Sequence, residues 1–151
     1  MTQRLKGEAP GPHLSEEDRE ALRRGAAEFN AGYYFECHDT LEEAWAGIRG
    51  EARDFFQGLI QVSVGLYHWR NGNAGGAATM LERGEKRLSR YPATYGGFDL
   101  GALRPEVEEA LRRVRSLEAF PETAEALPKF RLSDAVYVAR GNTPRSKDSD
   151  P

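Results

Sequence analysis

Residues 55–69 read FFQGLIQVSVGLYHW, and this stretch decides the fold. It contains no Asp, Glu, Lys or Arg, and in a helix its apolar residues would point in every direction around the axis. A helix that is apolar on all sides is buried, and this one is shorter than the ~18 consecutive apolar residues of a membrane span. We therefore expect a central buried helix at about residues 51–70 and no association with a membrane.

Helical spacing of apolar residues recurs on both sides of this stretch. Ser15 precedes three acidic residues, and a capping hydroxyl followed by first-turn carboxylates is typical of a helix N-terminus. Pro105 suits the first turn of a later helix. Helices are predicted after Ser15, over residues 33–48, 51–70 and 73–90, and from Pro105, with a short one around residues 122–127.

A weak internal repeat indicates how these helices pair. Gly32, Cys37, Leu41 and Glu42 recur at the same spacing as Gly72, Ala77, Leu81 and Glu82. Each glycine falls between two predicted helices, as the turn of a helix hairpin would. The sequence therefore predicts an all-α fold, a compact single-domain bundle of about five helices built from packed helix hairpins.

The ends of the chain differ in composition from its middle. We expect a flexible lead-in at residues 1–14, a single helical domain at 15–139 and a disordered polar tail at 140–151. Residues 93–101, which contain Gly96-Gly97, are predicted to form a loop, and residues 91–99 could serve as a lid over a pocket.

Composition narrows the classes of partner. The 151 residues include 21 basic and 24 acidic ones, and a net charge of −3 lacks the basic footprint of a nucleic-acid-binding protein. Cys37 is the sole cysteine, so an internal disulfide and a CxxC motif are excluded. Residues 1–12 contain no apolar signal core, and we expect a cytoplasmic protein. This composition is also compatible with a homo-oligomer.

Two polar residues of the 33–48 helix lie where apolar ones are expected. His38 and Glu42 fall within an apolar arc on a helical projection. The arc is otherwise formed by Tyr34, Phe35, Leu41, Trp45 and Ile48, while Glu36, Asp39, Thr40 and Glu43 are predicted to face solvent. Polar residues that break an amphipathic pattern are expected at functional sites.

The central helix shows the same anomaly. Gln57, Gln61 and His68 share one narrow stripe on a helix that is otherwise apolar. We therefore predict a semi-buried polar pocket between the 33–48 helix and the central helix.

The pocket suggests two kinds of chemistry. His38 and Glu42 would act as catalytic base and acid in a hydrolase-like reaction, because burial raises the pKa of a carboxylate and lowers that of an imidazole. Alternatively His38, Glu42 and His68 would bind a divalent metal such as zinc, as two histidines and a carboxylate do in catalytic metal sites. Gln57 and Gln61 would orient a small-molecule substrate that Tyr34 and Trp45 enclose.

A second hypothesis comes from a different class of protein. The buried polar residues would only bind one another and fix the register of the helices. The protein would then be a non-catalytic helical module that binds a ligand or another protein.

Two segments together resemble a known family. Residues 29–45 read FNAGYYFECHDTLEEAW, and residues 56–61 read FQGLIQ before His68. The chain is similar here to the bacterial and archaeal family called domain of unknown function 309, over about residues 28–103. Asp39 departs from the family, which more often has Glu at this position. The resemblance implies an all-α domain of packed helix hairpins and implies no reaction.

Overall fold

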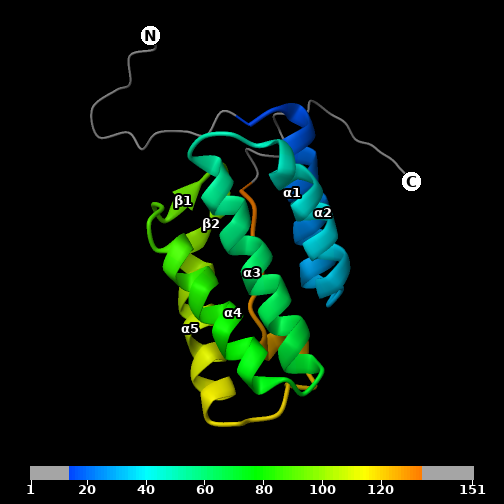
Figure 1. Cartoon of the computed structure of the whole chain (residues 1–151), viewed down its shortest axis with the longest axis vertical. Coiled ribbons are helices and arrows are strands. Elements are labelled where there is room, and N and C mark those ends of the chain that lie inside the picture. Colours follow the sequence, from blue (N-terminus) through cyan, green and yellow to red (C-terminus); the bar gives the residue numbers. More distant parts are fainter. Residues whose placement is uncertain (1–13, 134–151) are drawn as a thin grey trace.

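The computed structural model describes residues 14–133, and within them the predicted all-α bundle is confirmed. These residues form five α-helices and one small hairpin of strands, which are arranged as in Figure 1. The elements are α1 (Glu16–Asn30), α2 (Tyr34–Gly47), α3 (Ala52–Arg70), α4 (Ala74–Leu88), β1 (Thr94–Tyr95), β2 (Phe98–Asp99), α5 (Leu100–Arg115) and the short 3-10 helix Ala124–Ala126.

The first four helices form two hairpins, as the internal repeat predicts. Gly32 follows α1 with a φ of +89°, and Gly72 follows α3 with a φ of +79°. Glycine is the residue that adopts this left-handed conformation without strain, which is why it ends helices so often. The corresponding positions in the repeat therefore have the same function, which is to reverse the chain.

Helix α3 is the centre of the bundle, and it lies between α2 and α4 in Figure 1. Gly58 and Gly65 face α4, where a Cβ atom on either would lie 2.8 Å from a leucine side chain, Leu88 or Leu81. Gly84 of α4 faces α3 in the same way, because a Cβ atom there would lie 3.0 Å from the carbonyl oxygen of Gly58. The small residues let the two helices approach closely.

The start of α5 differs from its prediction. The helix begins at Leu100, and Pro105 lies inside it. The Asp99 side chain caps the N-terminus by accepting a hydrogen bond from the N–H of Ala102. Because Pro105 is on the exposed side, the backbone hydrogen bond that it removes is lost where water can replace it.

The predicted loop at residues 93–101 contains β1 and β2, which pair antiparallel. Gly96 and Gly97 both have positive φ angles, as a two-residue turn between twisted strands requires. Tyr95 and Phe98 are buried, with rings 4.9 and 5.6 Å from that of Phe55 at the start of α3. This packing gives the hairpin a role in the core.

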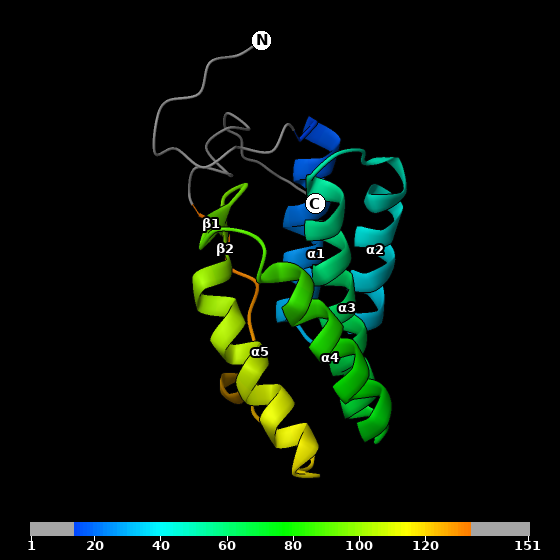
Figure 2. The same ribbon diagram turned by 60° about the vertical axis from the view of Figure 1, so that its left-hand side comes forward.

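After α5 the chain returns along the bundle in a largely extended segment, drawn in orange in Figures 1 and 2. Phe130 stacks on Phe29 of α1, with ring centroids 3.6 Å apart. Asp99 donates a backbone hydrogen bond to Arg131, which joins this segment to the strand hairpin. The segment thus completes the core that the helices leave open.

The predicted lead-in and tail lie outside the described residues, apart from Leu14, which is buried. Among residues 14–133, no helix combines the length and the apolar content that crossing a membrane requires.

Candidate functional site

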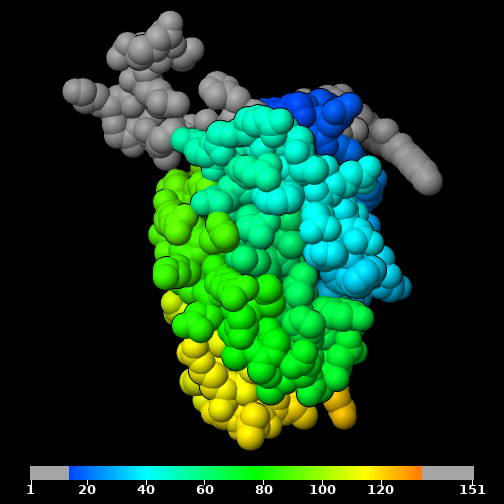
Figure 3. All heavy atoms as spheres, viewed as in Figure 1, coloured from blue at the N-terminus to red at the C-terminus, as the bar shows by residue number. Residues whose placement is uncertain are grey.

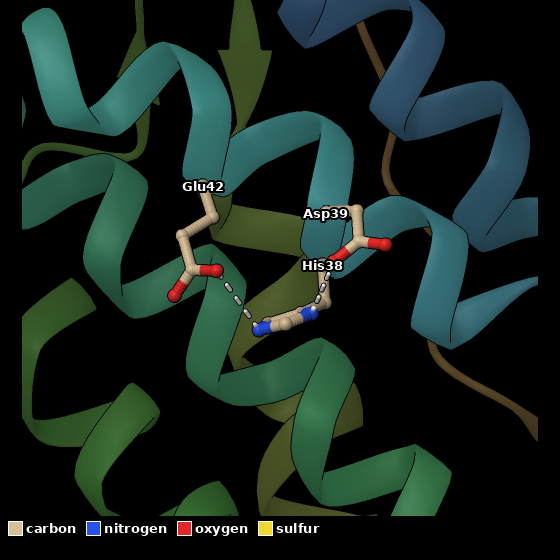
Figure 4. Close-up of side chains that lie close together, drawn as sticks. All are labelled: His38, Asp39 and Glu42. Carbon is tan, nitrogen blue, oxygen red and sulfur yellow. Dashed lines mark ion pairs between the residues drawn. The ribbon is translucent and has the colours of Figure 1, made fainter.

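One turn of α2 gathers a histidine and two carboxylates. Nε2 of His38 lies 3.4 Å from Oε1 of Glu42, and Nδ1 lies 3.2 Å from Oδ1 of Asp39. Figure 4 shows the imidazole between the two carboxylates. The ligand atoms of all three side chains lie within 4.8 Å of one another, and residues 14–133 contain no other group of this kind. We call His38, Asp39 and Glu42 the α2 cluster.

The α2 cluster is more open than predicted. The side chain of His38 is 22% exposed and that of Glu42 is 52% exposed. Figure 3 shows α2, in cyan, at the molecular surface beside α3. The site is therefore accessible to a ligand without any opening of the bundle.

The face of α2 that is buried in the structure is rotated around the helix axis relative to the apolar arc predicted from the sequence. The buried residues of the helix are Tyr34, Cys37, Thr40 and Leu41. Thr40 was expected in solvent and is buried, whereas Phe35 was expected inside and is half exposed. The reason is that α2 packs against α1 as well as α3, so its buried face turns toward α1 and moves His38 to the edge.

His68 does not join the α2 cluster. Its Nδ1 atom lies 3.4 Å from Nδ2 of Asn73, at the turn that leads into α4. The predicted ligand set of His38, Glu42 and His68 is therefore not assembled in this structure. Asp39, which was expected to face solvent, takes the third position.

Gln61 of α3 also faces α4. Gln61 is buried and accepts a hydrogen bond of 3.2 Å from Nε of Arg87. Arg87 also donates to Asp54, at 2.7 Å. Gln57 is half-buried on the same stripe. The stripe exists as predicted, but it lies along α4 and not along α2.

Tyr34 and Trp45 lie at opposite ends of α2. Tyr34 is buried beside Phe29 and Phe120, and burial raises its pKa to about 12 against the opposing effect of Arg70. Trp45 stacks under the guanidinium of Arg53, at 3.9 Å from the ring centroid. The ring of Phe35 lies 5.5 Å from that of His38 in the α2 cluster.

Sequence reasoning missed Asp39 as a member of the site. Its direct neighbour is His38, and adjacent residues on a helix usually diverge by about 100°. The side chains meet because the imidazole lies across the helix surface and presents Nδ1 to one carboxylate and Nε2 to the other. A histidine flanked by acids at the next and the fourth following position is the signal that was available.

The fold and the site define a small all-α protein of helix hairpins with an exposed His–carboxylate cluster. Residues 22–80 match the family described as Domain of unknown function (DUF309). The resemblance expected from the sequence motifs is therefore confirmed over these residues, which include the whole α2 cluster.

Two relatives extend the similarity. An uncharacterized protein of Aquifex aeolicus (strain VF5) is 26% identical over 95 residues, which cover 62% of this chain and 28% of that protein. The uncharacterized protein YpuF of Bacillus subtilis (strain 168) is 29% identical over 108 residues, which cover 70% of this chain and 62% of YpuF. The chain thus spans less than two thirds of either relative.

Proposed function

We propose that the α2 cluster binds a divalent metal ion, with zinc as the expected ion, and that the bound ion supports hydrolase-like chemistry on a small-molecule substrate. His38 and Glu42 are the proposed ligands. Asp39 is the partner that orients the imidazole from its other nitrogen. The cytoplasm is the proposed compartment.

One distance carries this proposal. Two ligand atoms bound about 2.1 Å from a tetrahedral zinc ion are about 3.4 Å apart. Nε2 of His38 and Oε1 of Glu42 are separated by 3.4 Å. The two side chains therefore need little rearrangement to share one ion.

Asp39 supports the same assignment. Histidines that bind metals usually present their second nitrogen to a carboxylate, which fixes the ring and raises its basicity. Nδ1 of His38 is buried and accepts or donates no hydrogen bond among the described residues, yet it lies 3.2 Å from Asp39. A small rotation of the exposed Asp39 carboxylate would complete that hydrogen bond.

The open geometry leaves the remaining coordination positions to water and substrate. A zinc-bound water has a pKa near 7 and supplies a nucleophile at neutral pH. These roles are those of a metal-assisted hydrolase.

Zinc titration of the metal-free protein, followed by calorimetry, tests the proposal. We expect one site per chain, with affinity reduced by about 10- to 100-fold or more in His38→Ala and Glu42→Gln. His68→Ala and Glu43→Gln are matched controls and should bind within about twofold of the parent protein. Equal binding by His38→Ala and the parent would refute the site.

A second candidate is a non-catalytic module that binds a ligand or a protein. The observation in its favour is that Oε1 of Gln61 accepts a hydrogen bond from Arg87, as in a structural residue. Under this alternative, zinc binding is absent and the exposed face of α2 around Phe35 is the contact surface. The same titration separates the two candidates.

A further inference from the structure

A second site lies on the other side of α2. A groove of about 850 Å³ runs between the N-terminal half of α1 and the C-terminal half of α2. Its walls include the small residues Ala21, Thr40, Ala44 and Gly47. Thr40 lies about 200° around the helix from both His38 and Glu42, so the groove lies on a different side of α2 from these two residues. We call it the acidic groove, for the residues at its rim.

The charges around the acidic groove are strongly unbalanced. Five carboxylates and one guanidinium line it, and they belong to Glu16, Glu17, Asp18, Glu20, Glu43 and Arg24. Glu16 and Glu20 bind Arg23, at 3.1 and 2.9 Å. The groove therefore keeps an excess of negative charge, to which both helices contribute.

Helix stability explains only part of this charge. Carboxylates in the first turn of α1 are favoured by the helix dipole, which accounts for Glu16, Glu17 and Asp18. Glu43 stands near the C-terminal end of α2, where the dipole does not favour an acid. The helix dipole therefore does not explain why Glu43 lies on the rim of the acidic groove, opposite α1.

Thr40 provides an independent observation. The residue lines the groove and is 7% exposed. Among the described residues, its hydroxyl has no hydrogen-bond partner, and its oxygen is not among the fully buried polar atoms, so it is open to the groove. Thr40 is thus a mostly buried residue whose hydroxyl can bind a polar group of a ligand in the groove.

We propose that the acidic groove binds a basic amphipathic helix of a partner protein. Two antiparallel helices with small residues between them form a surface into which a third helix packs. Apolar side chains of the partner would fill the space above Ala21, Ala44 and Gly47. Its Lys and Arg residues would meet the rim, and one polar group would bind the Thr40 hydroxyl.

A designed peptide tests this with the full chain. The probe is a fluorescein-labelled helix of about 16 residues with Leu at positions i, i+3, i+4 and i+7 and Lys elsewhere. We expect saturable 1:1 binding by fluorescence anisotropy, weakened by about tenfold or more when salt is raised from 0.05 to 0.5 M. A peptide with Glu in place of Lys should not bind. A peptide with Ser in place of Leu should bind at least about tenfold more weakly. Equal binding by the Leu and Ser peptides would contradict the proposal, because it would show that positive charge alone is enough for binding.

Variants locate the binding. The pair Glu17→Lys with Glu43→Lys should weaken peptide binding by about tenfold or more, because each lost ion pair is replaced by repulsion. The pair Glu122→Lys with Glu125→Lys makes the same change in net charge away from the groove and should leave binding within about twofold. An equal loss in both pairs would overturn the proposal.

Gly47→Leu tests the groove by its shape. A Cβ atom at Gly47 meets nothing within 4 Å, so the fold tolerates the larger side chain, which occupies the space that the peptide needs. Peptide binding should fall by about tenfold or more while zinc binding at the α2 cluster is unchanged. Full peptide binding by Gly47→Leu would refute the proposal whatever the outcome of the zinc titration.

Discussion

The side-chain amide of Asn30 binds the backbone of Phe130 through two hydrogen bonds, across a hundred residues of sequence. Nδ2 donates to the carbonyl oxygen and Oδ1 accepts from the N–H, each at 2.8 Å. One side chain thus replaces the pairing that a neighbouring strand would give to an extended segment. The contact holds Phe130 against Phe29 and joins the end of α1 to the last part of the described chain.

Asn30→Ala should lower the free energy of unfolding by about 1–3 kcal/mol, because it leaves two partly buried backbone groups without partners. Hydrogen exchange should also become faster around residue 130 and stay unchanged in α3. The control is Asn71→Ala, whose exposed side chain forms no hydrogen bond among the described residues. A loss of stability as large in Asn71→Ala would contradict this explanation.

Gly84→Ala should destabilise the protein by about 1–3 kcal/mol, since the new methyl group would lie 3.0 Å from the carbonyl oxygen of Gly58 and 2.9 Å from Val62. Gly75→Ala in the same helix has open space around it and should instead raise stability by up to about 1 kcal/mol. Chemical denaturation of both variants gives the comparison. If Gly84→Ala proved as stable as Gly75→Ala, the close approach of α3 and α4 would be wrong.

The thiol of Cys37 should resist modification in the folded protein. It is fully buried and lies 3.1 Å from Oγ of Ser63, and burial raises its pKa to about 12 from an ordinary value near 9. A thiol reagent at pH 8 should react only at the rate of unfolding. Fast reaction under native conditions would show that the thiol is exposed.

Stability should fall in alkali for the same reason. Between pH 9 and 12 the unfolded state loses the Cys37 proton while the folded state keeps it, so the contribution of this group is complete below pH 9 and is lost as the pH rises. Cys37→Ala should remove this slope, which amounts to about 1 kcal/mol per pH unit. Parallel denaturation curves of the two proteins from pH 8 to 11 measure the difference, and identical slopes would count against it.

Arg53→Ala should lower stability by about 1–3 kcal/mol. Its guanidinium donates to the carbonyl oxygens of Trp45 and Ile48, both at 3.0 Å, and stacks on the Trp45 ring. Lys should not restore the loss, because an ammonium group lacks the planar fork that makes these contacts together. Thermal unfolding of Arg53→Ala and Arg53→Lys measures this, with exposed Arg49→Ala as the control; full rescue by Lys would contradict it.

Much of the fold follows from residues whose effect is local. The absence of charge at residues 55–69 identifies the buried helix without reference to its neighbours. Gly32 and Gly72 mark the turns because the left-handed conformation is a property of one residue. Local signals of this kind can be recognised from one sequence alone.

The candidate site depends on which helix faces which, and periodicity does not fix that. Gln61 and His68 do share a stripe, yet the stripe meets α4, where Arg87 and Asn73 lie. His38 moves outward because α2 packs on two helices, and small Thr40 is buried in place of a larger apolar residue. The start of α5 was missed because Pro105 outweighed the capping capacity of Asp99.

The stacking of Phe130 on Phe29 also bears on the order of synthesis. A ribosome makes α1 and α2 well before Phe130 is translated, so the face of the Phe29 ring that Phe130 covers stays open during most of translation. The final closure of the core must therefore follow the release of the last helix from the exit tunnel. Until then, the exposed Phe29 surface is available to a chaperone.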